Sequence, residues 1–90
     1  MDKDSYDPEA REIARAILAY LAKNPEAKDT LDGITRWWLQ REWDGRATGQ
    51  AIALLLSREL LIETRRKGLA PYYHLSPKKR EEVSRMLKGP

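Results

Sequence analysis

The sequence predicts a mainly α-helical fold that carries a small antiparallel β-hairpin and ends in a C-terminal helix. Residues 8–59 contain three segments whose apolar residues recur at helical spacing. Residues 60–76 have the pattern of two short strands around a basic tip that contains glycine. Ninety residues make one small domain with a single modest core. We divide it into an acidic tail over 1–7, a core over 8–76 and a C-terminal helix over 77–90.

The first helix is expected to begin at Pro8 and to end before Pro25. Asp7 can cap its N-terminus, Pro8 fits the first helical position, and Glu9 places a carboxylate in the first turn. The apolar face of this helix consists of Ile13, Ile17, Leu18 and Leu21.

A second helix is expected to start at a cap formed by Thr30 or Asp29. Its apolar positions are Leu31, Ile34, Trp37 or Trp38, and Leu39. Adjacent helical residues point about 100° apart, so Trp37 and Trp38 cannot both face the centre of one core. The four-residue spacing from the preceding isoleucine assigns Trp38 to the core. Because the chain contains no phenylalanine, we expect Trp37 and Trp43 to serve the structure as well; the alternative is that an exposed tryptophan anchors an interface.

The third helix is expected over residues 46–59, a stretch rich in Ala, Leu, Gln and Arg that follows an Asp-Gly turn. At about 100° per residue, the expected inward positions are Gly49, Ile52, Ala53 and Leu56. The same register places on the outer face Ala47, Ala51, Leu54 and Arg58. A core shifted toward Leu55 and Leu60 also leaves Leu54 outside.

The segment after the third helix carries the most information. Its first strand opens with two apolar residues, and its second alternates apolar and polar positions as a half-buried strand does. These residues are Leu61 and Ile62, then Tyr73 and Leu75 alternating with Tyr72 and His74. The turn between the strands holds Arg65, Arg66 and Lys67. Gly68 is free to adopt a left-handed backbone there, and Pro71 fits an edge position.

The last helix is expected to start at a Ser76-Pro77 cap and to bury a narrow stripe of apolar residues. That stripe consists of Val83, Met86 and Leu87. Three cations in its first turn, at 78–80, oppose the helix dipole by about 0.3 to 1 kcal/mol each at exposed sites. Glu81 and Glu82 offset this cost together with the Ser76 cap; the alternative is a phosphate or acidic partner near the turn.

Charge divides unevenly along the chain, whose net charge is +3. Residues 1–45 hold seven Lys and Arg against ten Asp and Glu, a balance of −3. Residues 46–90 hold ten against four, a balance of +6. Such polarity orients a small domain in the field of a polyanion, with the basic half inward.

The order helix, helix, helix, strand, basic turn, strand, helix resembles the winged helix-turn-helix family across roughly residues 8–76. Five residues carry the resemblance, because they are spaced like a third helix that runs into the first wing strand. These residues are Ile52, Ala53, Leu56, Leu61 and Ile62. Residues 73–76 then close the hairpin. Where many members have glycine between the third helix and the strand, this chain has Leu60.

The resemblance implies that the third helix enters the major groove of duplex DNA while the wing contacts phosphates or the adjacent minor groove. The groove candidates by position are Arg46, Thr48, Gln50, Ala51, Leu54 and Arg58. Arg65, Arg66 and Lys67 are the phosphate candidates. Among the groove candidates, Gln50 suits adenine and Arg46 suits guanine.

A second hypothesis is a protein-docking or dimerising module that does not bind DNA. The outer face of the third helix, in the register given above, is small and apolar, which suits a protein partner better than a base edge. An interface of this kind, with a second copy or with another protein, would bury Ala51, Leu54 and Leu55.

Enzyme chemistry finds little support in the composition. The chain has one histidine, His74, and no cysteine, so it offers neither a thiol nucleophile nor a multi-histidine metal site. Its glycines are too scattered for a phosphate-binding loop. The longest apolar run, residues 51–56, is far below the ~20 residues of a membrane span. We expect a cytoplasmic protein with no catalytic residue, cofactor, metal, small-molecule substrate or membrane contact.

Overall fold

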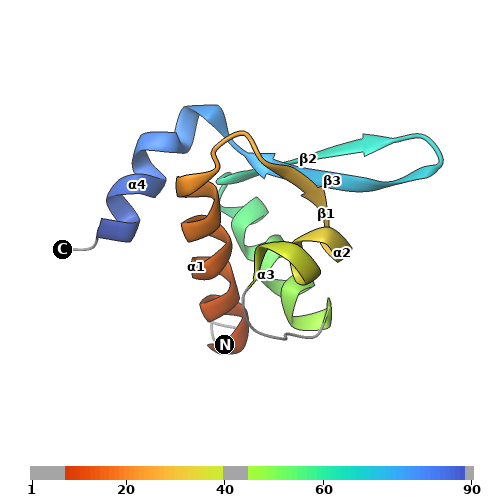
Figure 1. Cartoon of the computed structure of the whole chain (residues 1–90), viewed down its shortest axis with the longest axis horizontal. Coiled ribbons are helices and arrows are strands. Elements are labelled where there is room, and N and C mark those ends of the chain that lie inside the picture. Colours follow the sequence, from red (N-terminus) through yellow and green to blue (C-terminus); the bar gives the residue numbers. More distant parts are fainter. Residues whose placement is uncertain (1–7, 40–44, 89–90) are drawn as a thin grey trace.

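The computed structural model describes residues 8–39 and 45–88 (Figure 1). The elements follow in the order α1 (Pro8–Lys23), β1 (Lys28–Thr30), α2 (Leu31–Gly33), the π-helical turn η1 (Ile34–Trp38), α3 (Gly45–Ser57), β2 (Leu61–Arg66), β3 (Leu69–Leu75), the 3-10 turn η2 (Pro77–Lys79) and α4 (Arg80–Lys88). The described part of the chain is therefore mainly α-helical, with a hairpin after α3 and a C-terminal helix, as the sequence predicts.

The sheet has three strands in the order β1-β3-β2. The predicted hairpin is present, but the prediction of a sheet with only two strands is wrong, because β1 adds a third. β1 pairs antiparallel with β3, and Thr30 lies opposite Tyr72. Residues 28–30 show no strand pattern of their own, because the segment is only three residues long and largely polar. These residues form a strand because they pair with the edge of β3 that β2 leaves free.

The core lies between α1, α3 and the inner face of the sheet. α1 supplies an uninterrupted buried stripe, as its spacing predicts, and packs against both α3 and α4. Leu61, Tyr73 and Leu75 cover this core from the sheet, and Val83 closes it from α4. No helix in the described ranges is long and apolar enough to cross a membrane.

The second helical segment is shorter and less regular than expected. Thr30 caps it, because the Gly33 amide donates a hydrogen bond of 3.2 Å to the Thr30 hydroxyl oxygen. Trp38 is buried and stacks on Tyr20 with 4.7 Å between the ring centroids, as its core assignment requires. Trp37 is 75% exposed, so the expected structural role of this residue is wrong. The third tryptophan, at position 43, and the Asp7 cap lie outside the described residues.

The inward face of α3 is the alternative one, shifted toward Leu55 and Leu60, and it differs from the first expectation by about one residue. Its buried residues are Ala47, Thr48, Ala51, Ile52 and Leu55. Ala53 is exposed and Leu56 is half-buried, so neither is a central core residue. The prediction failed because α3 carries alanine or leucine on nearly every side, and packing against α1 selects the face that is buried.

α3 ends in a paired hydrogen-bond pattern typical of helix C-termini. The Leu60 amide donates to the Leu55 carbonyl and the Glu59 amide donates to the Leu56 carbonyl, each at 3.0 Å. Glu59 adopts a φ of +63°, a left-handed conformation that favours glycine. The expected glycine position is thus Glu59, one residue before Leu60.

Replacing Glu59 with glycine is expected to raise the free energy of unfolding by up to ~1 kcal/mol. The left-handed conformation costs a residue with a side chain roughly 1 to 2 kcal/mol, and the larger chain entropy of glycine when unfolded removes part of the gain. Urea denaturation checks this value. Glu59→Ala keeps the strain and is the control; equal stabilisation by both variants would contradict the strained-cap explanation.

α4 starts differently from the expected cap. Ser76 is buried, but its side chain makes no capping hydrogen bond, so this part of the prediction is wrong. The 3-10 turn η2 takes up Lys78 and Lys79, and Glu81 and Glu82 then occupy the first turn of α4. The cations therefore largely precede the helix, which reduces the expected conflict with its dipole.

Candidate nucleic-acid interface

The outward face of α3 is a narrow polar stripe. Arg46, Gln50, Ala53 and Ser57 follow one another at spacings of four, three and four residues, which keeps them within an arc of about 60°. Arg46, Ala53 and Ser57 are exposed, and Gln50 is half-buried. Arg46 and Gln50 thus share a face with two small residues, and the hydroxyl of one of them, Ser57, donates to the Leu54 carbonyl at 2.7 Å.

Several predicted site residues of α3 lie elsewhere. Thr48 is 0% exposed, so its side chain cannot reach DNA, and this prediction is wrong. Ala51 is buried in the core, which removes it from the predicted protein interface. Leu55 is also buried and reaches only the wall of a pocket that it shares with Leu54. Leu54 and Arg58 lie on the flank of α3 that borders α1 and α4, away from the polar stripe.

Ala53 and Ser57 complete this face, and neither is among the predicted site residues. Their signal is the repeat of Arg46, Gln50, Ala53 and Ser57 itself, which is visible only once the core is centred on Leu55. The inward register predicted from the sequence buries Ala53 and so hides the repeat.

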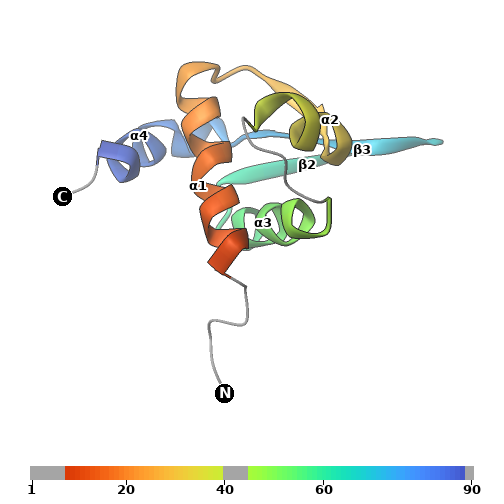
Figure 2. The same cartoon turned by 60° about the horizontal axis from the view of Figure 1, so that its bottom comes forward.

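The hairpin of β2 and β3 projects well beyond the helices (Figures 1 and 2). Its two-residue loop is Lys67-Gly68, and Gly68 adopts the expected left-handed backbone with a φ of +75°. The register shifts between the pairs Thr64–Tyr72 and Arg66–Leu69, so that β3 carries one extra residue there. Pro71 lies at this bulge and beyond the last pair with β1, where its missing N–H is tolerated.

The three wing cations do not form one cluster. Arg65 pairs with Glu63 on the inner side, with 3.2 Å between Nε and Oε1, while 79% of its side chain remains exposed. Arg66 leans to the outer side, where it donates to the Ala70 carbonyl at 3.1 Å. Lys67 is exposed in the loop. The hairpin therefore presents a cation on each face and one at its tip.

Glu63 holds the inner arginine in place from a fixed position. Its second carboxylate oxygen accepts a hydrogen bond of 3.1 Å from the Tyr73 hydroxyl. Burial of the ring and this hydrogen bond raise the pKa of Tyr73 above its usual value. Tyr73 therefore stays a neutral donor to Glu63, and the carboxylate remains oriented toward Arg65.

On the outer face, Tyr72 lies between two cations. The guanidinium carbon of Arg66 is 4.9 Å and the Lys28 ammonium 5.6 Å from the ring centroid, both within cation–π range. The basic surface of the hairpin thus continues across β3 to β1. Lys28 and Tyr72 were not among the predicted site residues, because only the pairing of β1 with β3 brings them together.

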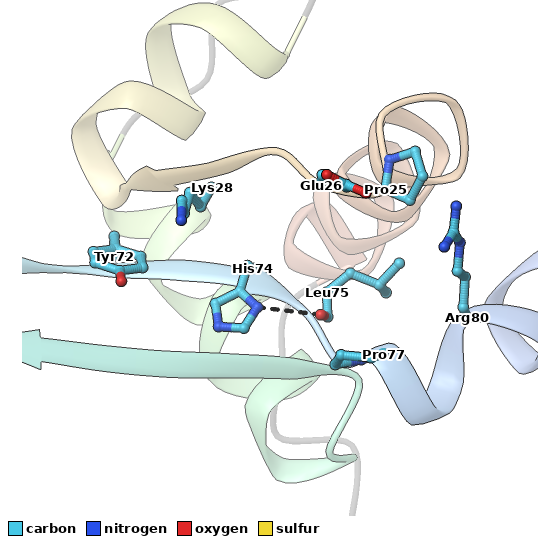
Figure 3. Close-up of a pocket in the computed structure, with 8 residues that line it drawn as sticks. All are labelled: Pro25, Glu26, Lys28, Tyr72, His74, Leu75, Pro77 and Arg80. Atoms are coloured by element: carbon cyan, nitrogen blue, oxygen red, sulfur yellow. Dashed lines mark hydrogen bonds between the residues drawn. The ribbon is translucent and has the colours of Figure 1, made fainter.

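An open pocket of about 350 Å³ adjoins this outer face near the start of η2 (Figure 3). Lys28 and Arg80 bring positive charge to its wall and Glu26 brings a carboxylate. His74 lies on the strand as expected, half-buried, with Nδ1 3.3 Å from the Leu75 carbonyl oxygen. Across the described residues, no group of three His, Cys, Asp or Glu side chains is placed to hold a metal ion.

The chain matches no model of a known protein family, no curated protein and no solved structure.

Proposed function

We propose that this chain is a winged helix-turn-helix domain that binds duplex DNA through the outer stripe of α3 and the basic hairpin. The observation that carries the proposal is the composition of that stripe. In place of the apolar face expected from the sequence, α3 presents Arg46, Gln50, Ala53 and Ser57 outward. The main argument for a purely protein-binding helix therefore no longer applies to this face.

The chemistry of the stripe suits a major groove. The guanidinium of Arg46 can donate two hydrogen bonds to guanine, and the amide of Gln50 can both donate to and accept from adenine. Ala53 and Ser57 are small, so the helix can approach the bases closely along its whole outer face. The Ala53 methyl group can also contact the methyl group of thymine.

The hairpin supplies contacts that do not depend on base identity. Because Arg65 and Arg66 lean to opposite faces, a hairpin laid along a groove can reach the phosphates of both strands that border it. Lys67 adds a cation at the tip. Residues 46–75, which comprise α3 and the hairpin, hold five Lys and Arg against two Asp and Glu, and this balance of +3 favours approach with this side toward DNA. As part of this proposal, the protein acts in the cytoplasm and has no catalytic activity.

Changing Arg65, Arg66 and Lys67 together to alanine is expected to weaken binding to any duplex and to flatten its salt dependence. If each cation neutralises one phosphate, the logarithmic salt slope falls by about 0.9 for each residue lost. Fluorescence anisotropy with a random-sequence duplex of about 20 base pairs, from ~50 to ~200 mM salt, measures both effects.

The matched control changes Lys78, Arg85 and Lys88 to alanine, which removes the same charge from η2 and α4, outside the pocket that adjoins the hairpin. This variant should keep the salt slope of the unchanged protein. An unchanged affinity and slope in the hairpin variant, or no binding of the unchanged protein at low salt, would overturn the proposal.

A further inference from the structure

α1, α3 and α4 enclose an apolar groove on a flank of the domain that the proposed DNA contacts do not use. In Figures 1 and 2, α1 lies between α4 and α3. The groove has a volume of about 290 Å³. Its apolar lining consists of Ala14, Leu18, Leu54, Leu55, Leu60, Met86 and Leu87. Met86 is 40% exposed, so the apolar stripe of α4 is only partly covered within the domain.

The rim of this groove is cationic. Arg11 and Arg15 project from successive turns of α1, and Arg58 follows the end of α3. None of the described residues that line the groove is Asp or Glu. An apolar floor with a rim of one charge matches a partner that carries apolar anchors flanked by carboxylates.

We propose that this groove binds an acidic amphipathic helix of a partner protein. A helix presents apolar side chains at intervals of three and four residues, which fit a groove of this kind, while carboxylates beside them reach the arginine rim. The volume of about 290 Å³ lies just below the roughly 300 to 1,000 Å³ typical of small-molecule sites, and it suits a few apolar side chains.

A second depression extends the surface along α1. It shares Arg15 and Leu87 with the groove and continues over Ala16, Ala19 and Ala22, with a volume of about 500 Å³. Its remaining lining residues are Glu12 and Lys23, so the excess of positive charge is confined to the groove itself. The small side chains at three-residue intervals allow another helix to approach the backbone of α1 closely. Together the two depressions follow α1 far enough to hold more than one turn of a partner helix.

A second copy of this chain fits the groove less well than an acidic partner. A symmetric dimer brings the same patch of both copies together, so the arginine rims of Arg11, Arg15 and Arg58 would face each other. Like charges placed opposite each other at an interface are costly. An acidic helix meets the same rim with opposite charge.

Binding in this groove does not depend on the proposed function. Leu54 projects about 100° away from Ala53 around the axis of α3, so the groove and the polar stripe occupy different faces of one helix. A partner on α1 and α4 therefore leaves the stripe accessible. A variant that loses binding in the groove should therefore keep its DNA affinity, and a variant that loses DNA binding should keep its binding in the groove.

The test selects binders from displayed peptides of about 18 residues, with apolar residues fixed at helical spacing. The remaining positions are drawn equally from Asp, Glu, Lys, Arg, Ser and Gln. The targets are the unchanged protein, Met86→Glu and the double variant Arg15→Glu, Arg58→Glu. Met86→Glu serves in place of a Leu54 variant, because Met86 is exposed enough for the fold to tolerate the change; circular dichroism verifies each target.

Selected peptides are expected to be enriched in Asp and Glu and to bind Met86→Glu at least ~10-fold more weakly. The double variant should instead select peptides rich in Lys and Arg. Three results would overturn the proposal: no peptide that depends on Met86, no excess of acidic residues, or a dimer in sedimentation equilibrium that Met86→Glu dissociates. The last result would assign the groove to a second copy. DNA affinity, measured on the same Met86 variant, should stay unchanged.

Discussion

Replacing Leu55 with alanine is expected to lower the free energy of unfolding by ~2 to 5 kcal/mol. Leu55 is 2% exposed and lies at the centre of the buried face of α3. Truncation removes apolar contacts and leaves a cavity that the surrounding helices fill only in part. Urea denaturation, followed by circular dichroism, measures the loss.

Leu56→Ala is the matched control, because it makes the same change at the next residue of the same helix. Leu56 is half-buried at the edge of the core, so its truncation should cost about 1 kcal/mol. The ratio of the two losses therefore reports the register of α3. A larger loss for Leu56→Ala would show that the helix turns its other side inward.

Replacing Ala53 with glutamate is expected to weaken duplex binding by at least ~100-fold, which corresponds to ~2.8 kcal/mol. Ala53 is exposed at the centre of the polar stripe, between Gln50 and Ser57. A carboxylate at this position would face the phosphates and base edges of DNA without a cation beside it on the stripe. Like-charge contacts of this kind cost several kcal/mol.

Ala22→Glu on α1 is the control for this experiment. It introduces the same side chain and charge at another exposed helical alanine, on a different element. Its effect on DNA affinity should stay within about threefold, since exposed charges beyond a Debye length are largely screened. Equal losses in the two variants, measured by anisotropy at ~0.1 M salt, would attribute the effect to net charge and remove α3 from the interface.

Local signals in the sequence predicted the order of helices and the hairpin correctly. α1 combines proline at its start with an uninterrupted apolar stripe, and these features suffice to place it. Thr30 and Gly68 each act through their own backbone neighbourhood, as a helix cap and as a left-handed turn residue. Trp38 was assigned to the core by its spacing alone. In each case the signal comes from residues that are close to one another in the sequence.

Tertiary structure decided the face that α3 presents. Apolar or small residues surround this helix, so its periodicity is compatible with more than one register. Packing against α1 selected the register in which Leu55 is buried and Ala53 is exposed, and burial of the leucine removes a large apolar side chain from water. The same choice moved Thr48 into the core and turned Leu54 toward the groove.

Long-range strand pairing decided the rest of the candidate site. The strand and turn pattern of residues 60–76 predicts a hairpin with Arg65, Arg66 and Lys67 at its end. The opposite faces of Arg65 and Arg66 follow from the alternation of side chains along one strand of this hairpin. The approach of Lys28 to Tyr72 from a third strand depends instead on backbone hydrogen bonds between residues more than forty positions apart, such as the pairing of Thr30 with Tyr72. Three polar residues become a strand only where a partner edge offers those bonds.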